Sequence, residues 1–174
     1  MRFLFYLIVL CAIVGCTKTN VQVKTINDIV CSIDLNGFDL LKSDSLNSDY
    51  SASKTITEIY YKTDNFSDST FFIWKYKINS TEECDIYDTI QVLENTVEYV
   101  QSKSRLIHVE SKGIKYINDR PFVYVIYNQE GRRNIFILVC FGKRGYSYLR
   151  FINFKHIDIV YKILNTFTYK KLKP

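Results

Sequence analysis

Hydrophobic and polar residues alternate over several short segments of the chain, a pattern typical of β-strands with one buried face. Residues 29–35 form the first such segment. Residues 55–63 and 70–78 are dense in β-branched and aromatic side chains, and the polar stretch between them has hairpin length. In the segment 70–78, one face carries the expected core residues Phe72, Trp74, Tyr76 and Ile78. The other face is predicted to be half solvated because it mixes apolar and basic residues, namely Phe71, Ile73, Lys75 and Lys77.

The pattern then changes to a helical period. The run Ser80-Thr81-Glu82-Glu83 fits a capping box, in which side chains satisfy the first free amides of a helix. Apolar residues follow at spacings of three and four: Ile86, Ile90, Leu93, Val97 and Val100. This stripe predicts a helix over residues 81–102. A second helix is predicted over residues 156–167 from the stripe Ile157, Val160, Leu164 and Phe167.

Four more strand-like segments lie between the two predicted helices, at residues 105–110, 122–127, 134–141 and 146–154. Glycine, asparagine and aspartate in their connections indicate tight turns and therefore an antiparallel meander. Because residues 134–141 are apolar on both faces, the sheet should be covered on both sides. The expected fold is α+β, a central antiparallel β-sheet flanked by two helices, in one domain over residues 29–174. The polar stretches 17–28 and 42–54 are expected to be a tether and a loop.

The first residues indicate an export signal. Met1-Arg2 is followed by an uncharged apolar run to Val14, which is too short to span a bilayer. The run ends in Ile13-Val14-Gly15-Cys16, which resembles the bacterial lipobox, where a small residue precedes the cysteine that is lipidated. This predicts a lipoprotein signal peptide over residues 1–15, cleavage after Gly15, lipidation of Cys16 and a short tether to residue 28. The alternative is an ordinary secretory signal with an incidental cysteine.

Charge is divided unevenly along the chain. Residues 17–102 hold 7 basic and 14 acidic side chains, whereas residues 103–174 hold 15 basic and 4 acidic ones. Such an asymmetry indicates a surface that faces anionic lipid or an acidic partner, unless strands from both halves alternate in the sheet and mix the charges. The net charge of +5 is too small to suggest nucleic acid as a partner.

No set of residues forms a catalytic or metal-binding motif. Cys31, Cys84 and Cys140 remain after the signal and the lipidation site, and they lack the spacing of a zinc site. If a disulfide forms, Cys31 with Cys84 is the favoured pair, because Cys140 lies in an apolar strand. His108 and His156 are expected at a strand and a helix start. Because no nucleophile and base are paired, we expect no enzyme activity, no cofactor and no metal.

Surface contacts are the remaining candidate function. Arg132, Arg133, Lys143 and Arg144 fall on the turns of neighbouring hairpins, and together they form a possible contact patch for an acidic partner or anionic headgroups. Tyrosines at positions 60, 61, 146 and 148 offer stacking surfaces, although aromatic residues in strands are usually core.

The second half of the chain resembles the PsbP and Mog fold group. The matching pieces are Ile117 to Phe122, the hydrophobic run Ile135 to Phe141, Gly145 to Leu149 and Ile163 to Phe167, within residues 80–169. The resemblance is one of hydrophobic and turn positions, and Thr166 stands where the group usually has serine. It implies an α/β/α sandwich and an accessory or binding role without catalysis.

These observations favour a membrane-anchored lipoprotein of the cell envelope that acts as a non-catalytic accessory or protein-binding module. The alternative is a carrier or sensor of a small apolar ligand, held in a cavity between sheet and helix. The expected partners are a membrane, through the lipid anchor, and a protein. Since Thr17-Lys18-Thr19-Asn20 has no aspartate directly after Cys16, we expect the periplasmic face, with the outer membrane favoured over the inner one.

The lipid anchor is tested by mass spectrometry of the mature N-terminus. We expect the first residue to be Cys16 carrying a diacylglyceryl group, because two acyl chains make membrane residence effectively permanent. An unmodified Cys16, or cleavage at another position, would contradict this prediction.

Overall fold

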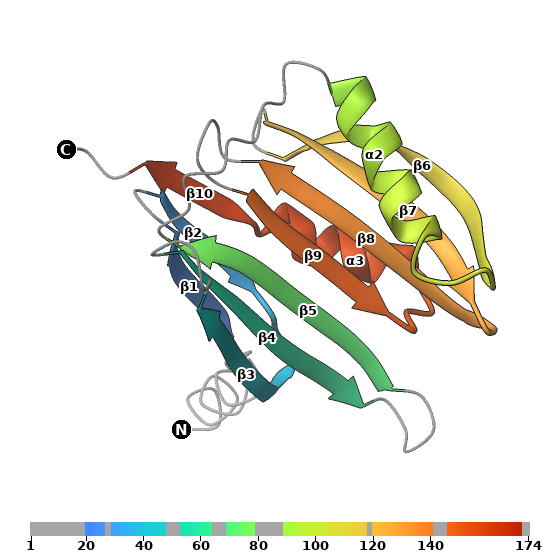
Figure 1. Ribbon diagram of the computed structural model, residues 1–174. Coiled ribbons are helices and arrows are strands. Elements are labelled where there is room, and N and C mark those ends of the chain that lie inside the picture. The colour runs from blue at the N-terminus through green and yellow to red at the C-terminus, as the bar shows by residue number, and fades with distance from the viewer. Residues whose placement is uncertain are drawn as a thin grey trace, which may run out of the picture.

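The computed structural model describes residues 20–26, 29–47, 53–63, 69–78, 89–117, 120–140 and 146–171. The predicted signal peptide, Gly15 and Cys16 lie outside this part. The described residues form two antiparallel sheets and two helices (Figure 1). The larger sheet has seven strands in the order β3-β4-β5-β9-β8-β7-β6. Their bounds are β3 Asp39–Asn47, β4 Lys54–Thr63, β5 Ser69–Ile78, β6 Ile107–Ile117, β7 Arg120–Gln129, β8 Arg132–Cys140 and β9 Tyr146–Ile152.

The predicted hairpin and meander are both present. β4 pairs with β5, and β6 to β9 pair in sequence as antiparallel neighbours. The turn between β7 and β8 holds Glu130 and Gly131 at φ 54° and 76°, the left-handed backbone that a two-residue turn of type I′ needs. β5 also pairs with β9, and this ladder joins the hairpin to the meander.

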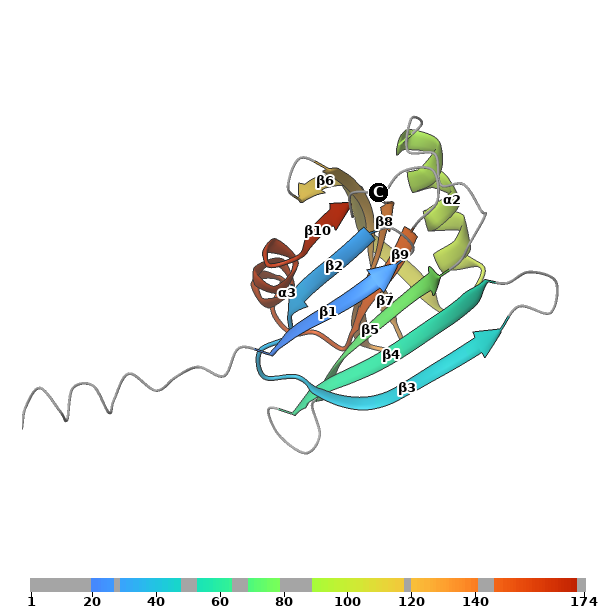
Figure 2. The ribbon, with the colours of Figure 1, turned by 90° about the vertical axis from the view of Figure 1, so that its left-hand side faces the viewer.

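The smaller sheet is built from both ends of the described chain. It has the order β1-β2-β10, with β1 Val21–Ile26, β2 Ile29–Asp34 and β10 Thr168–Lys171. The helices are α2 Thr89–Gln101 and α3 Ile157–Asn165. Figures 1 and 2 show α2 on one face of the large sheet, while the small sheet and α3 lie on the other face.

The expected α+β fold, a sheet flanked by two helices, is therefore wrong. The described part is mainly β, and a second sheet takes most of the place that a helix was expected to fill. Coverage on both sides of the meander was correctly predicted. In β8, Ile135, Ile137 and Val139 are buried beneath the small sheet and α3, and Phe136 is buried beneath α2.

Strands also form where the sequence predicted none. Residues 168–171, after the second predicted helix, form β10, which pairs with β2. The predicted loop 42–54 contains most of β3. All nine residues of this strand are exposed, so the segment shows no alternation of buried and polar residues that would have predicted a strand. The predicted tether contains β1, so the folded domain begins before residue 29.

β1 has an inverted pattern, in which polar residues face inward. Val21 and Val23 are exposed, whereas Lys24 points at the large sheet and donates to Glu58 Oε1 of β4 over 2.7 Å. The Tyr60 hydroxyl donates to the other oxygen, Oε2, also over 2.7 Å. Both carboxylate oxygens of the buried Glu58 are thus satisfied, which offsets the cost of burying its charge.

Two tyrosines share this buried seam between the sheets. Burial, and then the hydrogen bond to Glu58, raises the pKa of Tyr60 above its usual range. Burial, and then the charge of Glu58, raises the pKa of Tyr76 to about 12. Both hydroxyls therefore stay neutral at physiological pH, and Tyr60 remains a donor to the carboxylate.

The core between the two sheets contains the predicted face of β5. Phe72, Trp74 and Tyr76 are buried there, together with Val160, Leu164 and Phe167 of the predicted stripe at α3. The Trp74 indole Nε1 donates to Ser147 Oγ of β9 over 3.3 Å, and both residues are fully buried. The indole thus gains a partner within the ladder that joins the two halves of the sheet.

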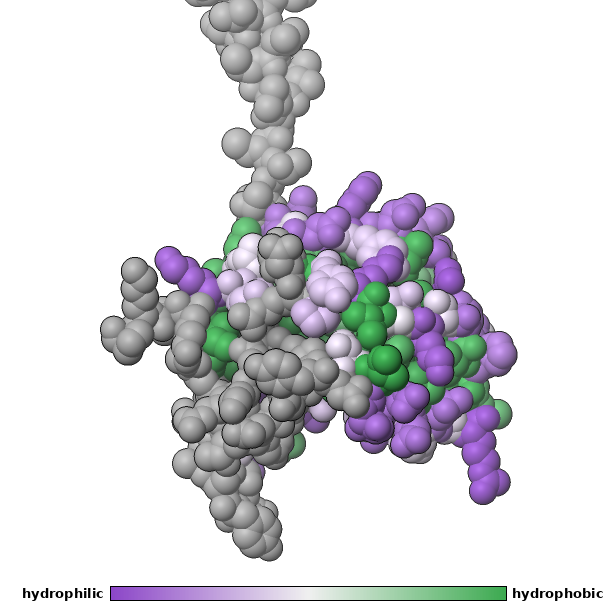
Figure 3. Space-filling view, turned by 90° about the horizontal axis from the view of Figure 1, so that it is seen from above, coloured by the Kyte–Doolittle hydropathy of each residue, from purple (hydrophilic) through white to green (hydrophobic). Residues whose placement is uncertain are grey.

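The predicted stripe of α2 is confirmed only at its C-terminal end. Val97 and Val100 are buried against the large sheet and Leu93 is half-buried, but Ile90 is 67% exposed and Ile86 lies outside the described residues. Figure 3 shows apolar side chains that reach the surface among hydrophilic ones at the end of the molecule seen from above. The expectation that Ile90 belongs to the core is wrong.

This difference along α2 gives a matched pair of substitutions. Val100→Asp places an unpaired carboxylate at a position that is 3% exposed and should lower the free energy of unfolding by about 3 kcal/mol or more. Ile90→Asp, the same change at an exposed position of the same helix, should shift it by no more than about 0.5 kcal/mol. Chemical denaturation checks both values. Equal effects of the two variants would contradict the observed burial of the helix.

Candidate functional site

The α2 side of the large sheet is only partly covered by the described residues. α2 packs on β6 and β7, with Phe136 of β8 in the same cluster. On β5 and β9 the side chains of this face lie beyond the helix. We call them the open face: Phe71, Ile73, Lys75 and Lys77 of β5 with Tyr148, Arg150 and Ile152 of β9. The register places Ile73 beside Arg150 and Lys75 beside Tyr148.

A groove of about 330 Å³ runs between the end of α2 and this face. We call it the α2 groove. Its lining combines aromatic and apolar side chains with three cations: Ile73, Lys75, Tyr76, Lys77, Tyr99, Phe136, Tyr148 and Arg150. No carboxylate is among these eight residues. Its volume lies at the lower end of the range for small-molecule sites.

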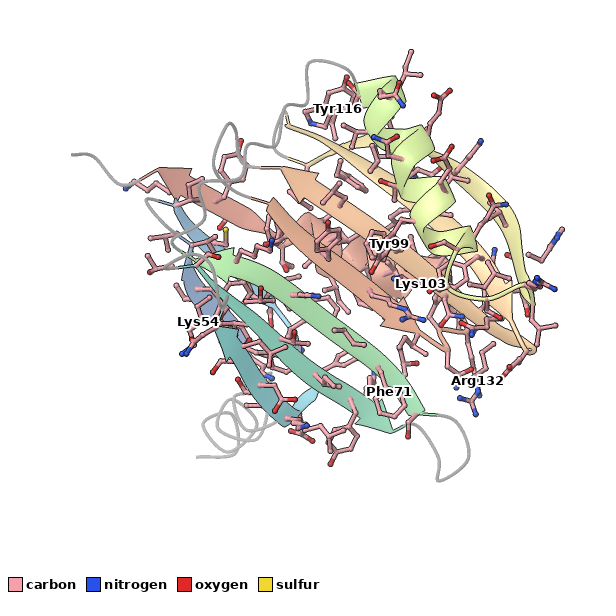
Figure 4. All side chains as sticks on the ribbon, in the orientation of Figure 1. Lys54, Phe71, Tyr99, Lys103, Tyr116 and Arg132 are labelled. Atoms are coloured by element: carbon pink, nitrogen blue, oxygen red, sulfur yellow. The ribbon has the colours of Figure 1, made fainter. Side chains whose placement is uncertain are left out.

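Three aromatic rings from three elements meet along the groove. The centroid of Phe136 lies 5.2 Å from that of Tyr148 and 5.5 Å from that of Tyr99. Tyr99 and Tyr148 are stacked at 6.4 Å. Lys103 Nζ lies 4.2 Å from the centroid of Tyr99, a cation–π contact. Figure 4 shows Tyr99 and Lys103 where the end of α2 overhangs β8 and β9, and Phe71 farther off near the start of β5.

Arg150 is the most unusual residue of the site. Its Nε is buried and has no hydrogen-bond partner, and its guanidinium carbon lies 5.7 Å from the centroid of Tyr127. Burial raises the pKa of Tyr127, and the nearby Arg150 opposes that rise, so the phenol stays neutral. A buried donor without a partner costs free energy unless a ligand supplies an acceptor. Arg150 is therefore suited to bind an anion in the groove.

The lining is suited to binding an anion that carries an apolar or planar group. The cations attract carboxylate, phosphate or sulfonate groups, and the rings provide faces for planar or apolar groups. The lining includes no cysteine, histidine or carboxylate that would act as nucleophile or base. Within the described ranges, no three His, Cys, Asp or Glu side chains gather as a metal site would require.

The predicted contact patch lies only in part within the described residues. Arg132 and Arg133 begin β8, and Arg133 Nε donates to Glu110 over 2.7 Å. Lys143 and Arg144 lie outside the described residues, beyond the other end of the strand at Cys140. Arg132 and Arg133 are therefore the described part of the patch, and the gathering of all four cations stays a prediction. Figure 4 shows Arg132 at its own corner of the sheet.

The cysteines follow the expectations in part. Cys31 is fully buried and carries a free thiol, which does not support the bond with Cys84. Cys84 lies outside the described residues, so the pairing stays a prediction. Burial raises the pKa of the Cys31 thiol to about 12, which leaves it protonated and unreactive. His108 lies in β6, and His156 is the residue before α3, as expected.

Sequence reasoning found some groove residues and missed others. It predicted the half-solvated face of Lys75 and Lys77, and it named Tyr148 as a stacking candidate. Tyr60, named with it, is 1% exposed and belongs to the core. Tyr99 and Arg150 were missed. The sequence did carry a signal for Arg150, because it is a single cation between the apolar residues Leu149 and Phe151 of a predicted strand.

A comparison with protein-family models, with curated proteins and with solved structures finds no match to this chain. The likeness to the PsbP and Mog group therefore stays an expectation from the sequence. The α/β/α sandwich that it implied is not the fold of the described residues, which form two antiparallel sheets. In the part of the chain that the structure describes, no helix is long and apolar enough to cross a membrane.

The unsatisfied Nε of Arg150 leads to a stability prediction. Arg150→Met keeps the length of the side chain and removes the unsatisfied donor, so the free energy of unfolding should stay constant or rise by about 1 kcal/mol. Arg133→Met is the matched control, because it removes the ion pair with Glu110 and should lower that free energy by up to about 1 kcal/mol. Denaturant melts measure both. A clear loss of stability in Arg150→Met would assign the guanidinium a structural role.

Proposed function

We propose that the protein is a membrane-anchored, non-catalytic binding protein of the cell envelope, and that the α2 groove receives an acidic segment of a protein partner. One observation carries the proposal: three cations and no carboxylate line a groove with an aromatic wall, and the buried Arg150 Nε lacks an acceptor. An acidic segment with one aromatic or apolar side chain offers complementary groups to both parts of this lining.

The arrangement of charge supports a docking role. In the large sheet, β3, β4 and β5 come from the acidic half of the chain, and β6 to β9 come from the basic half. The halves therefore do not alternate in this sheet. The groove lies at their junction, where two lysines of the acidic half join Arg150 of the basic half. Cations at a partly dry site bind anions more strongly than cations in open water do.

A second candidate is a carrier or sensor of a small ligand. The groove volume favours it, since about 330 Å³ is enough for a small molecule. Because the lining carries three cations, such a ligand would be an anionic amphiphile, with a carboxylate or phosphate joined to an apolar body. The purely apolar ligand considered from the sequence does not fit this lining.

The anchor and the compartment rest on the sequence alone. Lipidation at Cys16 holds the domain close to a membrane, and the absence of an aspartate after Cys16 favours the periplasmic face of the outer membrane. The tether is shorter than expected, because strand β1 already begins at Val21. The groove therefore works near the lipid surface.

The groove is tested with two fluorescent probes on the purified protein. The first is a labelled glutamate-rich peptide with one phenylalanine, and the second is anilinonaphthalene sulfonate, a small aromatic anion. Lys75→Gln should weaken peptide binding about tenfold, because a charge-assisted contact is lost. Lys112→Gln, the same change at an exposed position of β6, should leave it within about twofold.

The pattern of responses decides between the two candidates. Tight peptide binding that falls with salt and with Lys75→Gln supports the docking role. Binding of the small anion without the peptide supports the carrier. Equal losses in Lys75→Gln and Lys112→Gln would mean attraction by net charge alone and would contradict both.

A further inference from the structure

Among the described residues, one edge of the large sheet is an exposed strand. All nine residues of β3 are exposed, and they include three leucines, Leu40, Leu41 and Leu46, with Leu46 at 72% exposure. β3 pairs with β4 on one side, and Figure 2 shows it at the rim of the sheet. The other edge, β6, differs because α2 packs against it. An exposed edge with apolar side chains is a template for pairing with another strand.

The charges of β3 are complementary to those of a second β3. Lys42 and Asp44 stand symmetrically about Ser43, and they already form an ion pair of 2.7 Å within the strand. When two copies run antiparallel with the two Ser43 residues opposite each other, Lys42 faces Asp44 of the partner subunit, and the reverse pair forms at the same time. The four charges then alternate in sign around a square.

We propose that two copies of the chain pair through β3 in this register, about a two-fold axis at Ser43. In a C2 contact the same surface serves both partners, so one strand must be complementary to itself, as β3 is. Directly opposed side chains of unlike charge favour a register, and like charges disfavour it. A shift that centres the axis on Lys42 or on Asp44 places like charges opposite each other.

Two other registers lack these advantages. An axis between Leu40 and Leu41 pairs Asp39 with Lys42, but it crosses the irregularity between Leu40 and Lys42, where the ladder with β4 shifts. An axis between Asp44 and Ser45 opposes both charged residues with uncharged ones. The register centred on Ser43 alone brings the two unlike pairs together on the regular part of the strand.

This pairing has a consequence for the groove. Lys42 and Asp44 pair with Ile59 and Thr57, which in turn pair with Ile73 and Lys75 of the open face. Cross-strand neighbours point to the same side of a sheet. Both α2 grooves of the dimer therefore open on one face of a continuous sheet. The dimer itself does not depend on what the grooves bind.

Charge reversal on β3 tests the register. The dissociation constant of the dimer is measured by sedimentation equilibrium, with the full-length chain in a density-matched detergent. We expect a concentration-dependent dimer. Lys42→Asp alone and Asp44→Lys alone should each raise the dissociation constant about tenfold or more, because opposed pairs become like-charged. The double variant, Lys42→Asp with Asp44→Lys, should restore it, and an equimolar mixture of the two single variants should form heterodimers.

The controls separate pairing from folding. Both side chains are more than half exposed, so thermal melts of the variants should match the parent. Lys112→Asp, on the opposite edge, should leave dimerisation unchanged. A monomer at every concentration would overturn the proposal, because the charges of β3 would then only protect the edge. A dimer that is insensitive to the single reversals would overturn the register.

Discussion

The ladder between β5 and β9 is the contact on which the rest of the structure depends. It pairs residues 71–76 with residues 147–152, more than 70 positions apart in sequence. Without it, the hairpin and the meander would be two separate units, each with a bare edge. The buried Trp74 and Ser147 meet inside this ladder, so its centre has both apolar packing and a satisfied polar group. The α2 groove also depends on it, since Lys75 and Arg150 stand on the two paired strands.

The small sheet is attached by an interaction of a different kind. Lys24, Glu58 and Tyr60 form a chain of hydrogen bonds between β1 and β4 within an otherwise apolar interface. Such a set gives little net stability, because each charge must lose its water. It does fix the position of β1, since a shift by one residue would turn Lys24 outward and leave Glu58 buried without its cation. The apolar residues around it provide most of the stabilisation.

The sequence predicted elements whose burial follows their hydrophobic pattern. The alternation of Phe72, Trp74 and Tyr76 and the apolar run from Ile135 to Val139 were interpreted correctly, as was the order of the meander. The failures share a cause, because in β1 and β3 polarity does not report burial. Lys24 is inward because a distant carboxylate receives it, and β3 needs no buried face because it is an edge. Tyr99 belongs to α2 and Arg150 to β9, and only the folded chain brings the two side chains to the same groove. Local sequence patterns carry no information about such tertiary contacts.

The pairing of β2 with both β1 and β10 ties the start of the chain to its end. Residues 29–32 cannot complete their sheet until residues 168–171 are free to join them. Residues 168–171 are synthesised long after residues 29–32, so β2 can pair with β1 well before it can pair with β10. The small sheet, and the interface that it forms with the large sheet, are therefore completed only after α3 and β10 have been made.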